Sequence, residues 1–106
     1  MASITIFIPD KRRKEILDAL SRFKQSAEIS SGCIACQITR DLYRRNMICY
    51  IEEWQTREDL EKHIHSSNYR QLLEIIESSE QKPEIKFLSI SKVEGLEVVK
   101  TVRISR

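Results

Sequence analysis

The stretch 47–73, MICYIEEWQTREDLEKHIHSSNYRQLL, contains the only tryptophan and both histidines of the chain, and the other predicted elements are arranged around it. Its first part alternates in the manner of a β-strand. In that pattern Tyr50, Glu52 and Trp54 share one face of the strand. The sequence therefore predicts two aromatic rings and one carboxylate on a single strand face.

A helix is predicted directly after this strand. Thr56 is a residue type that caps helices, and Asp59 stands three residues later, in a variant of the capping box that has Asp in place of Glu or Gln. Leu60 and His63 then recur at helical spacing. Because the turn is sharp, the helix is expected to fold back beside Trp54, and any chemistry is expected there.

The remaining elements follow from alternation, helical spacing and turn residues. In chain order the sequence predicts strands at 3–8, 33–42, 47–54, from 83 onward and at 96–104, and helices at 10–27, 57–65 and from 66 or 67 onward. This order is a split βαβ unit followed by its approximate repeat, the ferredoxin-like α+β fold with an antiparallel sheet. The chain, residues 1–106, is expected to form one domain.

The predicted sheet has helices on one face only. Its other face carries enough apolar side chains to expose a large patch if it were left in water. A homodimer formed through the two sheets is therefore expected. The terminal strand at 96–104 would either extend its own sheet or pair across the dimer.

The charge balance argues against an obligate polyanionic partner. With 18 basic and 16 acidic side chains, the chain has no field strong enough to indicate nucleic acid or an anionic membrane. The basic run Lys11–Lys14 is interpreted as a solvated helix surface, in preference to a phosphate site. No stretch is long and apolar enough to span a membrane, and the apolar run Ile4–Pro9 is too short for a signal peptide.

The cysteines indicate a reducing compartment. Cys33, Cys36 and Cys49 are odd in number and lie in apolar, strand-like runs, which is typical of buried thiols in a cytoplasmic protein. Cys33 and Cys36 have the CxxC spacing of redox and zinc sites. Three residues along a regular strand place two side chains on opposite faces, so convergence of the two sulfurs is not expected.

Four short motifs occur in order along the chain. They are Ser31-Gly32-Cys33-Ile34 before a strand, Tyr50-Ile51-Glu52-Glu53-Trp54, Leu60 with His63 and Ser66, and Tyr69 with Leu72 and Leu73. Together they resemble the antibiotic biosynthesis monooxygenase family, over nearly the whole chain up to about Gly95. The resemblance implies a dimeric α/β barrel with a pocket between sheet and helices. For some members it also implies oxidation of quinols or polycyclic phenols by O2, with no metal, flavin or haem.

Such a reaction requires a group that removes a proton from the substrate and a dry aromatic pocket. His63 is the first candidate base, because an imidazole pKa near 6.5 suits proton transfer at neutral pH. Glu52 would orient it or act in its place, and Tyr50 completes the predicted catalytic set. The residues predicted to contact a small aromatic substrate are Trp54, Leu60, Tyr69 and Phe87.

Each of these assignments has a structural alternative. Trp54, Tyr50 and Tyr69 are also typical core aromatics. His63 stands in the last turn of its helix, where the helix dipole favours a histidine cation. One of the two glutamates of the strand, Glu52 or its neighbour, would then pair with Arg40 across the hairpin.

This chain differs from the better understood branches of the family at several positions, and these differences reduce the number of substrate classes that are expected. The branch that degrades haem has an Asn in its first strand and a His where Leu73 stands here, and haem binding through His63 alone stays open. Members that oxidise anthrones have an Asn where Tyr50 stands. A quinol or related phenol is thus the expected substrate. The alternatives are a non-catalytic small-molecule or haem-binding protein and, less favoured, an RNA-binding module, which would need a glycine and aromatic strand signature.

Overall fold

Alternating apolar residues build a four-stranded antiparallel sheet. The computed structural model describes residues 1–105. Its strands are β1 (Ala2–Phe7), β2 (Cys33–Arg40), β3 (Met47–Trp54) and β4 (Glu84–Phe87). They pair in the order β2-β3-β1-β4, with every neighbouring pair antiparallel. This is the ferredoxin-like order, so the predicted α+β fold is confirmed.

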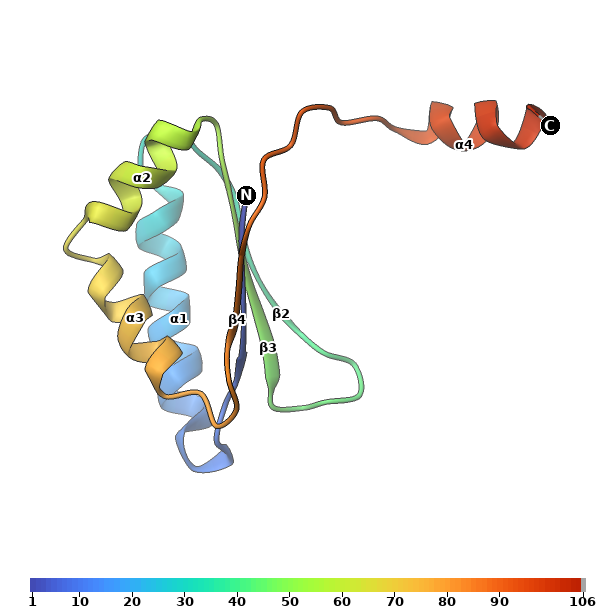
Figure 1. Cartoon of the computed structure of the whole chain (residues 1–106). Coiled ribbons are helices and arrows are strands. Elements are labelled where there is room, and N and C mark those ends of the chain that lie inside the picture. The colour runs from blue at the N-terminus through green and yellow to red at the C-terminus, as the bar shows by residue number, and fades with distance from the viewer. Residues whose placement is uncertain (106) are drawn as a thin grey trace.

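Helices cover one face of this sheet and leave the other open (Figure 1). The helices of the chain are η1 (Asp10–Arg12), α1 (Arg13–Glu28), α2 (Arg57–His65), α3 (Tyr69–Glu77) and α4 (Leu96–Ile104). α1, α2 and α3 lie along one face of the sheet, whereas α4 projects away from the sheet on the side of its open face. Helices on one face and solvent on the other explain the alternation of buried and half-buried residues along β1 and β3.

The core lies between the sheet and α1. On β1, Ile4 and Ile6 are buried, and α1 presents Leu20 and Phe23 to them at helical spacing. On α3, Leu72 is buried but Leu73 is half exposed, so only part of the predicted apolar stripe faces the core.

Two turns set the position of α2. Thr56 caps this helix as predicted, because its hydroxyl accepts a hydrogen bond from the Asp59 N–H at 3.1 Å. Gly32, in the turn before β2, has a φ of +85° and lies against the Asp59 side chain. Its carbonyl accepts the Gln55 N–H at 2.7 Å, which joins the start of β2 to the start of α2. At α1, by contrast, Asp10 makes no side-chain cap, and the η1 turn precedes the helix instead.

A β-bulge at the start of β2 overturns the expectation for the cysteine pair. Cys33 pairs with Trp54 and Cys36 with Glu52, and the register shifts between them. Because residues paired across an antiparallel sheet point to the same face, both cysteines face the helices. The extra residue, Ile34, is 63% exposed on the other face. The prediction of opposite faces was wrong because it assumed a regular strand.

The predicted terminal strand at 96–104 was also wrong, because this segment is the helix α4. Leu96, Val99 and Val102 recur every three residues, which suits a helix as well as a loose alternation. The Glu97 carboxylate accepts the Gly95 N–H at 2.8 Å and places a negative charge in the first turn, where the helix dipole favours it. No residue of α4 is buried.

No helix in the described chain combines the length and the apolar character that a membrane crossing needs.

Candidate active site

A buried carboxylate on β3 organises the polar core. Glu52 is only 2% exposed. Its Oε2 accepts the Tyr50 hydroxyl at 2.7 Å, and its Oε1 accepts the Trp54 indole N–H at 3.1 Å. His63 Nε2 lies 2.9 Å from Oε2. The three side chains of β3 meet because alternation puts them on one strand face, and α2 brings His63 to the same place.

This network fixes one proton of the imidazole. A carboxylate accepts hydrogen bonds and cannot donate them, so we assign a proton to Nε2 of His63. Within residues 1–105, no protein group bonds to Nδ1, and the only fully buried side-chain N or O atom without a partner is Asn46 Oδ1. His63 is also one of the residues that line a cavity of about 260 Å³.

Aromatic rings hold the imidazole on three sides. Its centroid lies 4.6 Å from that of Trp54 and 5.3 Å from that of Phe23. Tyr69 meets it edge-on, at 5.4 Å and 87°. This packing restricts the His63 ring to one orientation, and it also fills the space between sheet and helices.

Tyr50 is held in its protonated form. Burial, followed by the nearby charge of Glu52, raises its pKa far above the ordinary range of a phenol. Its oxygen accepts the Cys36 S–H at 3.0 Å, and burial raises the pKa of that thiol to about 11. Tyr50 thus donates to Glu52 and accepts from Cys36, which suits a positioning role better than proton abstraction.

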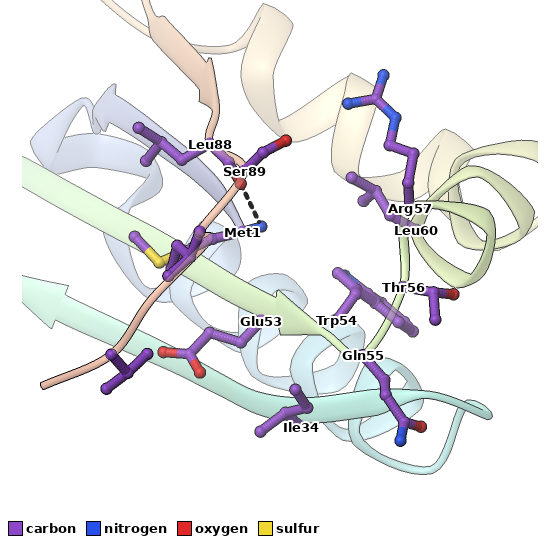
Figure 2. A pocket seen from close by; sticks show the side chains of 12 residues that line it. Met1, Ile34, Glu53, Trp54, Gln55, Thr56, Arg57, Leu60, Leu88 and Ser89 are labelled. Atoms are coloured by element: carbon purple, nitrogen blue, oxygen red, sulfur yellow. Dashed lines mark hydrogen bonds between the residues drawn. The ribbon is translucent and has the colours of Figure 1, made fainter.

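Two cavities meet at Trp54. The first, about 360 Å³, lies between the open sheet face and the segment after β4, and Figure 2 shows Ile34, Glu53 and Leu88 around it. The second, about 260 Å³, lies between the end of α1, one side of α2 and the start of α3. We call it the serine cleft, and its lining residues are Ser26, Ser30, Ser31, Trp54, Asp59, Lys62, His63, Ser66 and Asn68. Trp54 lines both cavities and separates them.

The remaining predicted site residues are dispersed. Leu60 is buried and lines the first cavity, next to Trp54 in Figure 2. Tyr69 belongs to the aromatic cluster and lines neither cavity. Phe87 lies at the sheet edge, half exposed, with the Arg57 guanidinium 6.0 Å from its ring centre.

The predicted alternative for Glu52 does not match the register. Arg40 pairs with Ile48, and the residue opposite Glu52 is Cys36. The structure also adds site residues that the sequence did not single out, namely Cys36 and the serines at the end of α1. The Ser30-Ser31-Gly32 turn was visible as a turn only. Its serines line the cleft because the C-terminal end of α2, at Ser66, lies against the same cavity.

Among residues 1–105, no group of three or more His, Cys, Asp or Glu side chains could hold a metal ion.

Comparisons with known proteins agree with the fold. The sequence model of the family described as antibiotic biosynthesis monooxygenase matches residues 1–74. A solved structure described as an antibiotic biosynthesis monooxygenase has a TM-score of 0.74 at 18% identity, covering 87% of this chain and 100% of that one. A candidate antibiotic biosynthesis monooxygenase from Deinococcus radiodurans has a TM-score of 0.81 at 12% identity, covering 90% and 95%.

A conserved protein from Methanosarcina mazei Go1 is similar as well, with a TM-score of 0.74 at 17% identity, covering 80% of this chain and 85% of that one. No curated protein matches the sequence. At these identities the solved structures support the fold, and the match to the family's sequence model, which spans most of the chain, establishes membership. The chain belongs to the antibiotic biosynthesis monooxygenase family.

Proposed function

We propose that the protein is a monooxygenase that oxidises a quinol or related phenol with O2 and needs no metal or organic cofactor. The observation that carries this proposal is the buried His63, whose Nε2 lies 2.9 Å from Glu52 Oε2 and which lines the serine cleft beside Trp54. A base with one nitrogen fixed by a carboxylate and the other free is the arrangement that general-base catalysis uses.

In the proposed reaction His63 Nδ1 takes the proton of a substrate hydroxyl. The resulting phenolate is electron-rich, and it reduces O2 by one electron. Recombination then forms a carbon–oxygen bond, and cleavage of the O–O bond leaves one oxygen on the ring and releases the other as water. One hydroquinone and one O2 thus become one hydroxyquinone and one water, which balances every atom. The substrate supplies all the electrons, so no external reductant is consumed.

The neighbours of His63 have separate tasks in this scheme. Glu52 stabilises the imidazolium that forms when Nδ1 accepts the proton, because its carboxylate already bonds to Nε2. Trp54 offers a ring face to the substrate at the boundary of both cavities. Tyr50 holds the carboxylate in place through its 2.7 Å hydrogen bond.

The functional unit in this proposal is a homodimer. The open sheet face presents half-buried Phe7, Met47 and Ile51, and α4 leaves this side of the molecule with exposed apolar residues (Figure 1). A helix as short as α4 is marginal in water unless its apolar side is covered. A second copy would cover both surfaces and close the first cavity, which lies on this face.

Oxygen uptake with a panel of hydroquinones tests the activity. Metal-stripped protein should consume O2 faster than protein-free controls, and His63→Gln should lower the rate by about a hundredfold or more. The matched control is His65→Gln, on the same helix but exposed to solvent. Uptake that is unchanged in His63→Gln would overturn the proposal. Binding without uptake would identify a small-molecule binding protein instead.

A further inference from the structure

Basic side chains gather at the end of the sheet where the β2–β3 hairpin turns. The Arg13 guanidinium donates to the Arg45 carbonyl at 2.9 Å, and Arg45 Nε lies 4.0 Å from Asp10 Oδ1. These contacts join the start of α1 to the hairpin loop, and Figure 1 shows η1 and this loop at the same end of the molecule. We call this end the basic tip and define it by residues 10–15 and 40–46.

The small net charge of the chain conceals this concentration. The basic tip has seven basic and three acidic side chains, whereas the rest of the chain has eleven basic and thirteen acidic ones. Six of the seven basic residues are exposed. The turn before β4 reaches the same end of the sheet and adds Glu80 and Lys82, whose charges cancel. A balance near zero argues against an obligate polyanionic partner, but a positive end on a slightly negative molecule suits a reversible, local contact with an anionic surface.

Two apolar side chains project from the basic tip. Leu42 is 79% exposed, and Tyr43 is 90% exposed. The loop that carries them is held by Asp41, whose Oδ2 accepts the Tyr43 N–H at 3.0 Å and the Arg44 N–H at 2.8 Å. The Arg44 carbonyl also accepts the Met47 N–H at 3.0 Å. A preformed turn therefore presents both side chains to solvent, so little ordering is needed when a partner covers them.

We propose that the basic tip docks on the surface of an anionic lipid bilayer, with Leu42 and Tyr43 among the headgroups and the neighbouring arginines against lipid phosphates. Apolar burial and attraction to anionic lipids add together in such a contact. Tyrosine is enriched at the membrane interface, because its ring is amphipathic. A nucleic acid would also attract the arginines, but its phosphates give Leu42 no apolar surroundings.

Docking in this orientation leaves the candidate active site in water. β3 begins at Met47, beside the basic tip, and ends at Trp54, which is about 23 Å away at about 3.3 Å per residue. Both cavities at Trp54 therefore lie at the opposite end of the sheet from the bilayer. Membrane docking and the proposed oxidation are independent of each other, and each can fail without the other.

Co-sedimentation with lipid vesicles tests the docking on the unaltered protein. Vesicles of phosphatidylcholine alone are compared with vesicles that also contain phosphatidylglycerol, at low and at high NaCl concentration. At low salt the protein should bind the anionic vesicles at least about tenfold more tightly than the neutral ones. This binding should fall at least about tenfold at high salt, because salt screens the attraction between arginines and lipid phosphates.

Two double variants separate apolar insertion from charge. Leu42→Ser combined with Tyr43→Ser should weaken binding to anionic vesicles at least about tenfold, because it removes the inserted side chains. Arg44→Gln combined with Arg45→Gln should weaken it by a similar factor and reduce its dependence on salt. Far-ultraviolet circular dichroism checks that both variants keep the fold.

Matched controls remove the same kinds of side chain elsewhere. Ile29→Ser replaces an apolar residue that is 88% exposed just after α1 ends, away from the basic tip. Arg22→Gln combined with Arg70→Gln removes two exposed arginines from α1 and α3. Both controls should bind anionic vesicles as tightly as the unaltered protein does, within about threefold.

Three outcomes would overturn the proposal. The first is equal binding of the unaltered protein to neutral and anionic vesicles, and the second is binding that neither double variant weakens. The third is salt-sensitive retention of short RNA without binding to anionic vesicles, which would make the basic tip a nucleic-acid surface. A dimer that dissociates in Leu42→Ser with Tyr43→Ser, in a protein that binds no vesicles, would also overturn it and make the tip a contact between copies.

Discussion

Glu52 contributes both to the arrangement of the candidate site and to the stability of the fold. It accepts three hydrogen bonds, from Tyr50, Trp54 and His63, in a buried position. A buried donor that loses its acceptor costs about 1–3 kcal/mol. The arrangement of the site and part of the stability of the fold therefore depend on the same carboxylate.

The first prediction concerns this carboxylate. Glu52→Gln keeps the shape but turns one acceptor oxygen into an N–H2 donor that faces other donors. The free energy of unfolding should fall by about 1–3 kcal/mol, and O2 uptake should fall by about a hundredfold or more. Urea denaturation and oxygen-electrode rates check the two effects. The control is Glu53→Gln, the next residue along β3, which is exposed on the other face. Equal effects of the two substitutions would contradict the role given to Glu52.

The second prediction concerns alkaline pH. Burial raises the pKa of Cys36 from 9.0 to about 11 and raises that of Tyr50 as well, so the folded state keeps both groups protonated when the unfolded chain has lost these protons. The contribution of these two protonated groups to the free energy of unfolding is complete below about pH 9, and the part from Cys36 is lost as the pH rises toward 11. The loss from Cys36 should be of order 2 kcal/mol.

Urea denaturation at several pH values between 8 and 11 measures this loss. Cys36→Ala has no thiol to titrate, so its free energy of unfolding should fall less steeply with pH than that of the unaltered protein. Parallel curves for the two proteins would show that the burial of Cys36 contributes nothing to the pH dependence.

At the scale of elements, Gly32 connects two parts of the site. Its φ of +85° suits glycine, and the space where a Cβ would stand is occupied by the Asp59 side chain. The turn at Gly32 thus fixes the first strand residues of β2 and the first turn of α2 together.

The third prediction follows from this turn. Gly32→Ala should lower the free energy of unfolding by at least about 1–2 kcal/mol, through backbone strain and the displacement of Asp59. Gly95→Ala is the control, since its φ of −110° is ordinary and its nearest neighbour is the flexible end of Glu97. Its effect should stay within about 0.5 kcal/mol.

The elements differ in how well local sequence predicts them. The strand-to-helix unit at Thr56 was predictable because the cap, the alternation and the helical spacing agree within a few residues. The bulge at Ile34 was not, because nothing between Cys33 and Ala35 distinguishes a bulged strand from a regular one. The segment that became α4 was ambiguous, since Val and Thr favour strands while spacing every three residues favours a helix.

Part of the membership of the candidate site was predictable from the sequence, but its geometry was not. Alternation alone put Tyr50, Glu52 and Trp54 on one face, and helical spacing put His63 near them. The direction of the imidazole nitrogens depends on packing against Phe23, which comes from a distant part of the sequence. The aromatic rings that fill the space between the sheet and the helices, such as Phe23 and Tyr69, also come from distant parts of the sequence, so their packing could not be predicted locally.

At the scale of the whole molecule, the chain is more extended than its length requires. Its radius of gyration is 16.2 Å, whereas a compact chain of about this length has one of about 13 Å. The difference comes from the segment after β4 and from α4, which extends away from the rest of the molecule in Figure 1. Leu96, Val99 and Val102 are each at least half exposed there. The chain by itself therefore leaves apolar surface exposed, which the proposed second copy would bury.

The last prediction tests this dimer. The protein should sediment as a dimer at micromolar concentration, and Val99→Asp combined with Val102→Asp should shift it to a monomer, because two carboxylates cannot be buried in an apolar contact without a partner. Thr101→Asp is the control, since it adds one carboxylate at a polar position of the same helix. All variants should keep the far-ultraviolet circular dichroism of the sheet and of α1–α3. A dimer that survives both valine substitutions would place the interface on the sheet alone, and an unaltered protein that sediments as a monomer would refute the dimer.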